Sequence, residues 1–183
     1  MVDLIAQSAF EGLLPKEIGD VRLVELDAGP LTLLQPFAGT RDALDQLLKT
    51  RLGVSCPAPG RMVGKAGARI MWFGRDDYMM IGLQAPEGVE EFASVTDQSD
   101  AWGICEIRGA GAEAVLSRLV PVDLRGKNFK RGHTCRTMLA HVNVSISLTG
   151  EDVFQIMGFR SMAHTMVHDL AQAMTHVAAR AGN

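Results

Sequence analysis

The sequence predicts an α+β fold in which a βαββ unit occurs twice, so that antiparallel or mixed sheets are flanked by helices. Three observations predict it: alternating apolar segments enclose short helical patterns, the order strand, helix, strand, strand recurs in both halves, and matching positions share residue types. With 183 residues the chain is long enough to bury a sizeable core. We therefore expect one domain over residues 1–183, with pseudo-repeats over about 21–90 and 95–179.

The first half opens with a segment that has no clear period. Residues 1–17 mix apolar positions with glycine and proline, which indicates an arm or a short helix lying on a partner surface. Alternation from Val21 to Leu34 then predicts one or two strands. A helix is expected from Thr40, the N-cap, to the residue before Gly53, because its leucines recur at helical spacing (Leu44, Leu47, Leu48 and Leu52).

A turn and a hairpin complete this half. The stretch from Cys56 to Gly60 contains two prolines and a glycine, so it is expected to turn. The apolar runs 68–73 and 78–83 are joined by Gly-Arg-Asp-Asp, which predicts two antiparallel strands.

The second half repeats this order and adds a long helix. Strands are expected over 102–108, 137–148 and 153–157, and a short helix over 112–119 follows the glycines at 109 and 111. The final helix is expected from Ser161, its cap, to Ala179. Its mainly apolar face, which we expect to cover a sheet, comprises Met162, Thr165, Met166, Asp169, Leu170, Ala173, Met174 and Val177.

Matching residues link the two halves directly. At a separation of 72 positions, Gly39, Leu44 and Leu47 correspond to Gly111, Leu116 and Leu119. At a separation of 76 positions, Gly74, Asp76, Tyr78 and Gly82 correspond to Gly150, Asp152, Phe154 and Gly158. A four-residue insertion reconciles the two offsets, which favours a duplication over chance agreement between two βαββ segments.

Composition disfavours several classes of function. The net charge is −3 and the densest basic cluster, Lys127, Lys130 and Arg131, has one nearby aromatic, which is a poor nucleic-acid footprint. The three cysteines lack CxxC spacing and are interpreted as reduced thiols. No stretch reaches the roughly 20 apolar residues that cross a bilayer, and acidic residues occupy the N-terminal region, so we expect no membrane contact and a cytoplasmic protein.

The sequence predicts no catalytic residue and no metal site. Neither GxSxG nor a phosphate-binding glycine loop occurs, so the chain is not expected to be a self-sufficient enzyme. His164 and His168 share a helical face, as zinc ligands do, but no acidic residue lies between them as in HExxH. They are interpreted as a solvated or partner-facing stripe, and Cys135 close to His133 as part of a structural turn.

Several motifs of the second half together resemble the γ subunit of heterotetrameric sarcosine oxidase. The resemblance extends over about 95–170 and is carried by Val95 to Trp102, Gly109 to Ala112, Leu116, Leu119, Pro121 to Leu124, Arg136 to His141, and Arg160-Ser161. The turns at Cys56 to Gly60 and Gly74 to Tyr78 depart from the family pattern, which leaves the substrate open.

This resemblance implies both a fold and a function. The fold is that of the folate-binding domain of the glycine-cleavage T-protein, an aminomethyltransferase. The partners are α, β and δ subunits, which hold FAD, FMN, NAD, tetrahydrofolate and zinc, while this chain holds no cofactor and serves assembly and stability. The complex oxidises sarcosine to glycine, passes the one-carbon unit to tetrahydrofolate, and reduces O2 to H2O2.

Three alternatives stay open. The chain could serve a related N-methylglutamate or N-methylamine dehydrogenase, act as a free-standing folate-binding aminomethyltransferase-like protein, or be a generic binding module. For folate the candidate residues are Asp97, Asp100 and Glu106, and no spacing selects one of them. For a subunit interface the candidates are Trp102, His164, His168 and Met166.

Overall fold

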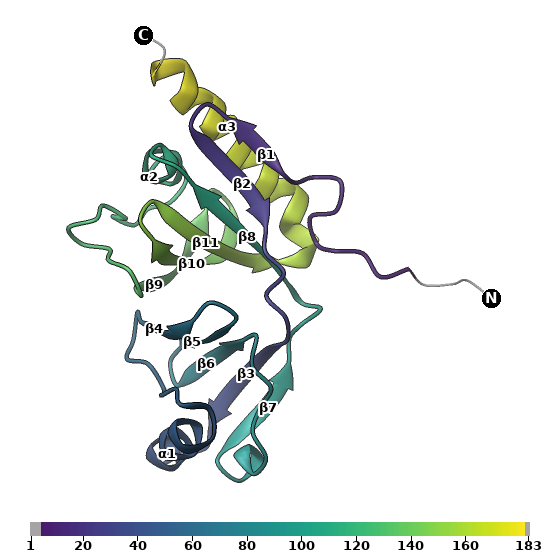
Figure 1. The fold of residues 1–183 in the computed structure, drawn as a ribbon, viewed down its shortest axis with the longest axis vertical. Helices are drawn as coiled ribbons and strands as arrows, with labels where there is room; N and C mark the ends of the chain where they lie inside the picture. The colour runs from purple at the N-terminus through teal and green to yellow at the C-terminus, as the bar shows by residue number, and fades with distance from the viewer. Residues whose placement is uncertain (1–4, 182–183) are drawn as a thin grey trace.

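The computed structural model describes residues 5–181. Within that range the chain forms two antiparallel sheets and three α-helices (Figure 1). Sheet A has the order β1 (Lys16–Ile18), β2 (Val21–Glu25), β8 (Trp102–Arg108), β11 (Val153–Phe159), β10 (Val142–Gly150), β9 (Thr134–Leu139). Sheet B has the order β4 (Met62–Lys65), β5 (Ala68–Gly74), β6 (Asp77–Ile81), β3 (Leu31–Pro36), β7 (Ala93–Asp97).

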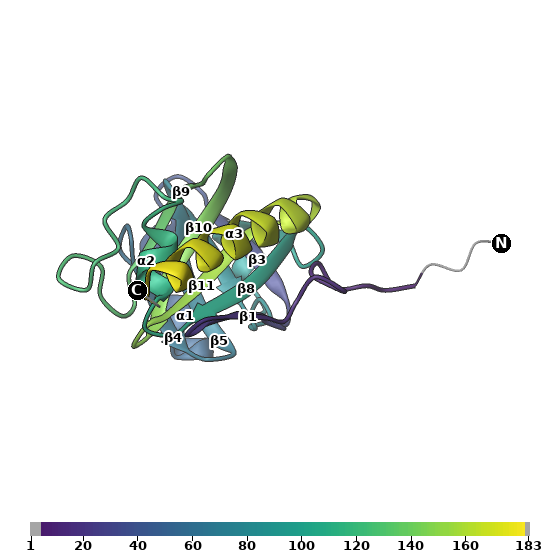
Figure 2. The ribbon, with the colours of Figure 1, turned by 90° about the horizontal axis from the view of Figure 1, so that it is seen from above.

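The sheets and helices form four layers. Apolar residues alternate along the strands, so each sheet has one face toward helices and one toward the other sheet. Helices α2 (Ala112–Leu116) and α3 (Ala163–Ala181) pack on sheet A, and Figure 2 shows α3 lying over that sheet. Helix α1 (Arg41–Leu52) packs on sheet B through Leu44 and Leu48, which lie one turn apart. No helix within 5–181 is long and apolar enough to span a membrane.

The two halves of the chain have the same topology. The series β3, α1, β4, β5, β6 gives the sheet order β4-β5-β6-β3, and the series β8, α2, β9, β10, β11 gives β9-β10-β11-β8. Each sheet is then extended by a strand that leads into the other half, because β2 pairs with β8 and β7 pairs with β3. The division of 1–183 into one domain with two pseudo-repeats stays a prediction, and this shared order favours it.

Several predicted elements were wrong in extent. The expected single strand over 137–148 is the hairpin β9–β10, turned at Ala140, whose backbone has a φ of 49°. Alanine is not a residue that marks turns, so the sequence carried no signal there. The N-terminal arm contributes β1 instead of a helix, and strands β4 and β7 were not predicted. The part of the arm before residue 5 lies outside the described residues.

The helix ends also differ from the expectation. Gly53 ends α1 with a φ of 68°, as predicted. The hydroxyl of Thr40 does not cap that helix, because it lies 2.9 Å and 2.5 Å from the carbonyl oxygens of Phe37 and Phe92. The chain forms a 3-10 turn at Arg160–Met162, so α3 begins at Ala163 and not at Ser161. Helix α2 ends three residues early, at Leu116.

Gly109 lies where the turn between β1 and β2 crosses the end of β8. Its φ is 121°, and a Cβ added there would lie 1.9 Å from the carbonyl oxygen of Asp20. Because that neighbour is backbone, Gly109→Ala is expected to lower the free energy of unfolding by about 2–4 kcal/mol in urea denaturation. At Gly126 nothing lies within 4 Å of an added Cβ. Gly126→Ala should therefore change stability by less than about 0.5 kcal/mol, and equal losses for both variants would contradict this account.

Candidate functional site

The inner faces of the two sheets meet in a layer that we call the seam. Its centre is apolar and combines side chains from both sheets, among them Met71 and Met79 of sheet B and Ile104 and Met157 of sheet A. Beside this centre, one row across sheet A is polar, because the pairing register places Glu106, Gln155, Ser147 and Thr134 side by side. Side chains of directly opposed residues share a face, so all four point into the seam.

The polar row is fully bonded. The hydroxyl of Ser147 donates to that of Thr134 at 2.8 Å, and Arg69 of β5 donates from Nη1 to Oε1 of Gln155 at 3.1 Å. Across residues 5–181 no buried side-chain nitrogen or oxygen lacks a partner. Because every buried side-chain polar atom in that range has a partner, this network favours the observed packing of the two sheets over arrangements in which those atoms would lose their partners.

At one end of the seam Trp102 is the centre of an aromatic and cationic stack. Its ring stacks on Phe159 at 4.4 Å between centroids and meets the edge of Phe73 at 5.2 Å. The guanidinium of Arg136 lies 4.0 Å from the centroid of Phe73 and 5.7 Å from that of Trp102, both within the range of cation–π attraction. We call Phe73, Trp102, Arg136, Phe159 and the neighbouring Met138 the Trp102 platform.

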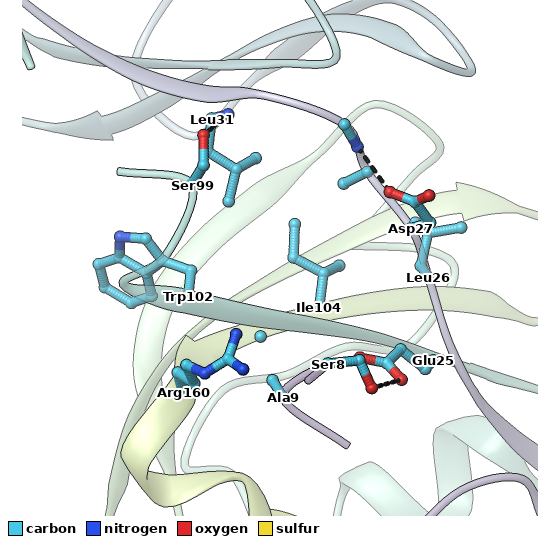
Figure 3. A pocket seen from close by; sticks show the side chains of 13 residues that line it. Ser8, Ala9, Glu25, Leu26, Asp27, Leu31, Ser99, Trp102, Ile104 and Arg160 are labelled. Carbon is cyan, nitrogen blue, oxygen red and sulfur yellow. Dashed lines mark hydrogen bonds between the residues drawn. The ribbon is translucent and has the colours of Figure 1, made fainter. Parts of the chain in front are cut away.

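A cavity of about 440 Å³ opens beside this platform. In Figure 3, Trp102 and Arg160 lie on one side of the cavity and Glu25 and Asp27 on the other, with Ile104 between them. Glu25 accepts a hydrogen bond from Ser8 at 2.7 Å, so the N-terminal arm forms part of the wall. The cavity thus presents both signs of charge and one aromatic face.

The three folate candidates do not come together. Asp97 ends β7 and accepts hydrogen bonds from the hydroxyl and the backbone amide of Ser99, which lower the pKa of its carboxyl group. Asp100 lies in the following turn, and neither aspartate lines the large cavity. Glu106 faces a separate cavity of about 110 Å³ and lies 3.6 Å from Arg108. The 97–100 segment serves as a turn whose Gln98 accepts from Trp102 Nε1 at 3.1 Å.

The four interface candidates have different environments. His164 and His168 lie on the exposed face of α3. Trp102 is only 8% exposed, so the accessible surface of the platform belongs mainly to its neighbours Met138 and Phe159. Met166 is fully buried beneath sheet A and faces Gly158. Its prediction as an interface residue was therefore wrong, because a side chain on the inner face of α3 packs against the sheet and does not reach a partner. For the two histidines and Trp102 the interface role stays a prediction.

The cysteines are held as protonated thiols. Burial raises the pKa of Cys135 to about 11, of Cys56 to about 11 and of Cys105 to about 12. Near Cys135, the pKa of His133 is lowered by burial and by the positive charges of Arg61 and Lys130. A neutral thiol and a neutral imidazole do not form the ion pair that activates a nucleophilic cysteine.

The charged residues that line the walls of the two larger cavities at the seam, Glu25, Asp27, Arg69, Arg131 and Arg160, were not predicted as site residues. They come from segments far apart in the chain, and they lie near one another only because strands of the two halves pair and the two sheets pack together. The alternation of β5 was a usable signal for one of them, because it places Arg69 on the same face as Met71 and Phe73.

Comparison with known proteins identifies the family. No family model matches the chain. The sarcosine oxidase γ subunit of Corynebacterium sp. strain P-1 is 30% identical over 153 residues, which cover 78% of this chain and 71% of that one. The γ subunit of Arthrobacter sp. is 30% identical over 144 residues, covering 72% and 70%, and that of Corynebacterium sp. strain U-96 is 28% identical over 142 residues, covering 72% and 69%. The chain belongs to the family of sarcosine oxidase γ subunits.

Solved structures confirm the fold. A chain of the heterotetrameric sarcosine oxidase from Corynebacterium sp. U-96, solved with pyrrole 2-carboxylate, superposes with a TM-score of 0.80 at 24% identity, covering 94% of this chain and 96% of that one. The glycine cleavage system aminomethyltransferase T from Bartonella henselae gives 0.57 at 14% identity, covering 84% and 46%. The predicted α+β fold and its likeness to the folate-binding fold of the T-protein are thus confirmed.

The raised thiol pKa values have a direct chemical consequence. A thiolate is the reactive form, so a pKa above its ordinary value leaves less of it at pH 8. Cys135, the most accessible of the three, should react with iodoacetamide at least about tenfold more slowly in the native chain than in urea, because each pKa unit lowers the thiolate population about tenfold. Mass spectrometry of the alkylated peptides measures this, and its rate should still rise between pH 8 and 10. Equal native and unfolded rates at pH 8 would contradict the burial of this thiol.

Proposed function

We propose that the chain is a non-catalytic γ-type subunit of a heterotetrameric sarcosine oxidase and serves assembly and stability. Membership of the γ-subunit family supports this, and the observation that carries it is the partly uncovered Trp102 platform. The complex would oxidise sarcosine to glycine, pass the one-carbon unit to tetrahydrofolate and reduce O2 to H2O2. FAD, FMN, NAD, tetrahydrofolate and zinc would reside in the α, β and δ subunits, and the complex would work in the cytoplasm.

The platform has the properties of an interface centre. Trp102 and Phe159 are directly opposed on β8 and β11, and Met138, opposite Asn143 on β10, extends this row toward the edge strand β9. Sheet B does not cover the outer part of that row, where Met138 and Phe159 are each 44% exposed. Aromatic residues, methionine and arginine are the residue types enriched where proteins associate. β9 is also the edge strand of sheet A, which leaves part of its backbone free to pair.

A second function is favoured by the large cavity. Its volume of about 440 Å³ falls within the range of small-molecule sites, and the fold is that of a folate-binding domain. A free-standing folate-binding protein would place the pterin there, with Glu25 or Asp27 as acceptor for its N–H groups. A dehydrogenase for N-methylglutamate or another N-methylamine remains a third candidate, which differs only in the partner subunits.

The assembly role is tested by shortening the exposed platform residues. The double variant Met138→Ala/Phe159→Ala, co-expressed with the genes beside it, should bind the flavin-bearing subunits at least about tenfold more weakly than the unmodified chain, because hot-spot truncations cost over about 1.4 kcal/mol. Size-exclusion chromatography with absorbance detection measures the co-eluting fraction. Phe37→Ala is the matched control, since Phe37 is 49% exposed but lies beside α1.

Two outcomes would oppose the assembly role. Full co-elution of the double variant would remove the platform from the interface. A colourless monomer that bound tetrahydrofolate by itself, with the loss of binding in Asp27→Asn, would favour the free-standing folate protein.

A further inference from the structure

A second cavity lies at the end of the seam where the turn between β4 and β5 meets the loop before β9. Its volume is about 190 Å³, and three of its lining residues carry positive charge, Lys65, Arg69 and Arg131. The remainder of the wall includes the backbone of Gly64 and Gly132. The space exceeds the roughly 30 Å³ that a water molecule occupies in the liquid, so it accommodates a small ligand.

Backbone hydrogen bonds tie the loop before β9 to β4 of sheet B and to β10 of sheet A at the rim of this cleft. The amide of Met62 donates to the carbonyl of Gly132 at 2.8 Å, and the amide of Gly132 donates to the carbonyl of Leu148 at 2.9 Å. At Gly64 the backbone passes so close that an added Cβ would lie 2.2 Å from the carbonyl oxygen of Ala68. These contacts fix the position of the loop that carries Arg131 relative to the strand that carries Arg69.

The charge in the cleft is unbalanced. Of the salt bridges formed within residues 5–181, none involves Lys65, Arg69 or Arg131. The side-chain hydrogen-bond partner of Arg69 is the neutral Gln155, and the carboxylate of Glu106, which lines an adjoining cavity together with Arg69, lies 3.6 Å from Arg108. Burial and then the positive charge of Arg131 lower the pKa of Arg69, while Glu106 opposes the shift. The chain as a whole is acidic, so this is a local concentration of positive charge.

We propose that the cleft binds a small anion through a phosphate or carboxylate group placed between Arg69 and Arg131, with Lys65 at the rim. Guanidinium groups present forked donors that match the paired oxygens of these groups, and the half-buried Arg69, which forms no salt bridge, would gain a charged partner from such a ligand. The anion would also relieve the repulsion between the two guanidinium groups. The site lies on this chain alone and does not depend on the assembly role.

The test uses the full chain labelled with ¹⁵N and titrated with inorganic phosphate or, separately, with glutarate, at ionic strength held constant with sodium chloride. The expected result is saturable shifts of the Gly64, Lys65 and Gly132 amides with a Kd below about 10 mM for at least one anion. The anion that binds more tightly identifies the group. Arg131→Gln, at an exposed position that should not affect folding, should raise that Kd at least about tenfold, and Arg131→Lys should lie between because it keeps the charge without the fork.

The matched control is Arg51→Gln, which removes an equally exposed charge at the end of α1 and should leave the Kd unchanged. Two results would overturn the proposal: no saturable shift of these amides with either anion, or the same Kd in Arg131→Gln as in the unmodified chain. Neither result bears on co-elution with other subunits, so the two proposals fail separately.

Discussion

In this protein the strand that precedes each half pairs with the first strand of the other half, and the remaining structure depends on this exchange of strands. Because β2 pairs with β8 and β7 pairs with β3, neither half can complete its sheet alone. This pairing holds the inner faces of the two sheets in contact, so the apolar side chains at the centre of the seam are buried between sheet A and sheet B. Burial of apolar surface at about 25 cal/mol per Å² then stabilises the two halves as one unit.

Polar residues in the seam fix how the two sheets pack on each other, and they line the cavities at its ends. The bond from Arg69 to Gln155 crosses between the sheets beside the apolar centre, and a one-residue shift of either strand within its own sheet would point that strand's side chain outward and break the bond. Side chains do not fill the space at the ends of the seam. The Trp102 platform and the large cavity lie at one end, and the cleft between Arg69 and Arg131 lies at the other. The same packing that joins the halves therefore also places the surfaces to which we assign function.

Local pattern was enough to predict many elements. The leucine spacing of α1, the hairpin β5–β6 and the whole of β8 follow from neighbouring residues, and all three occur as expected. The resemblance to the γ-subunit family supplied the fold and is confirmed. The turn at Ala140 was missed, since an alanine in a left-handed conformation leaves no mark in the sequence.

The site was predicted less well, for a physical reason. Its residues are brought together by pairing between strands far apart in the chain, and no local period reports such pairing. No spacing selected among Asp97, Asp100 and Glu106, and none of them lines the large cavity, where Glu25 and Arg160 lie. Met166 was named as an interface candidate although it lies on the apolar helix face expected to cover a sheet, and that face is buried against sheet A.

The central claim is that this chain contacts its partner subunits through the Trp102 platform. Hydrogen–deuterium exchange, measured on the chain alone and in the purified complex, tests it most directly. The account predicts that assembly slows exchange in β9 and at the end of β11, around Met138 and Phe159. Protection confined to α3, with β9 exchanging as fast in the complex as alone, would contradict it.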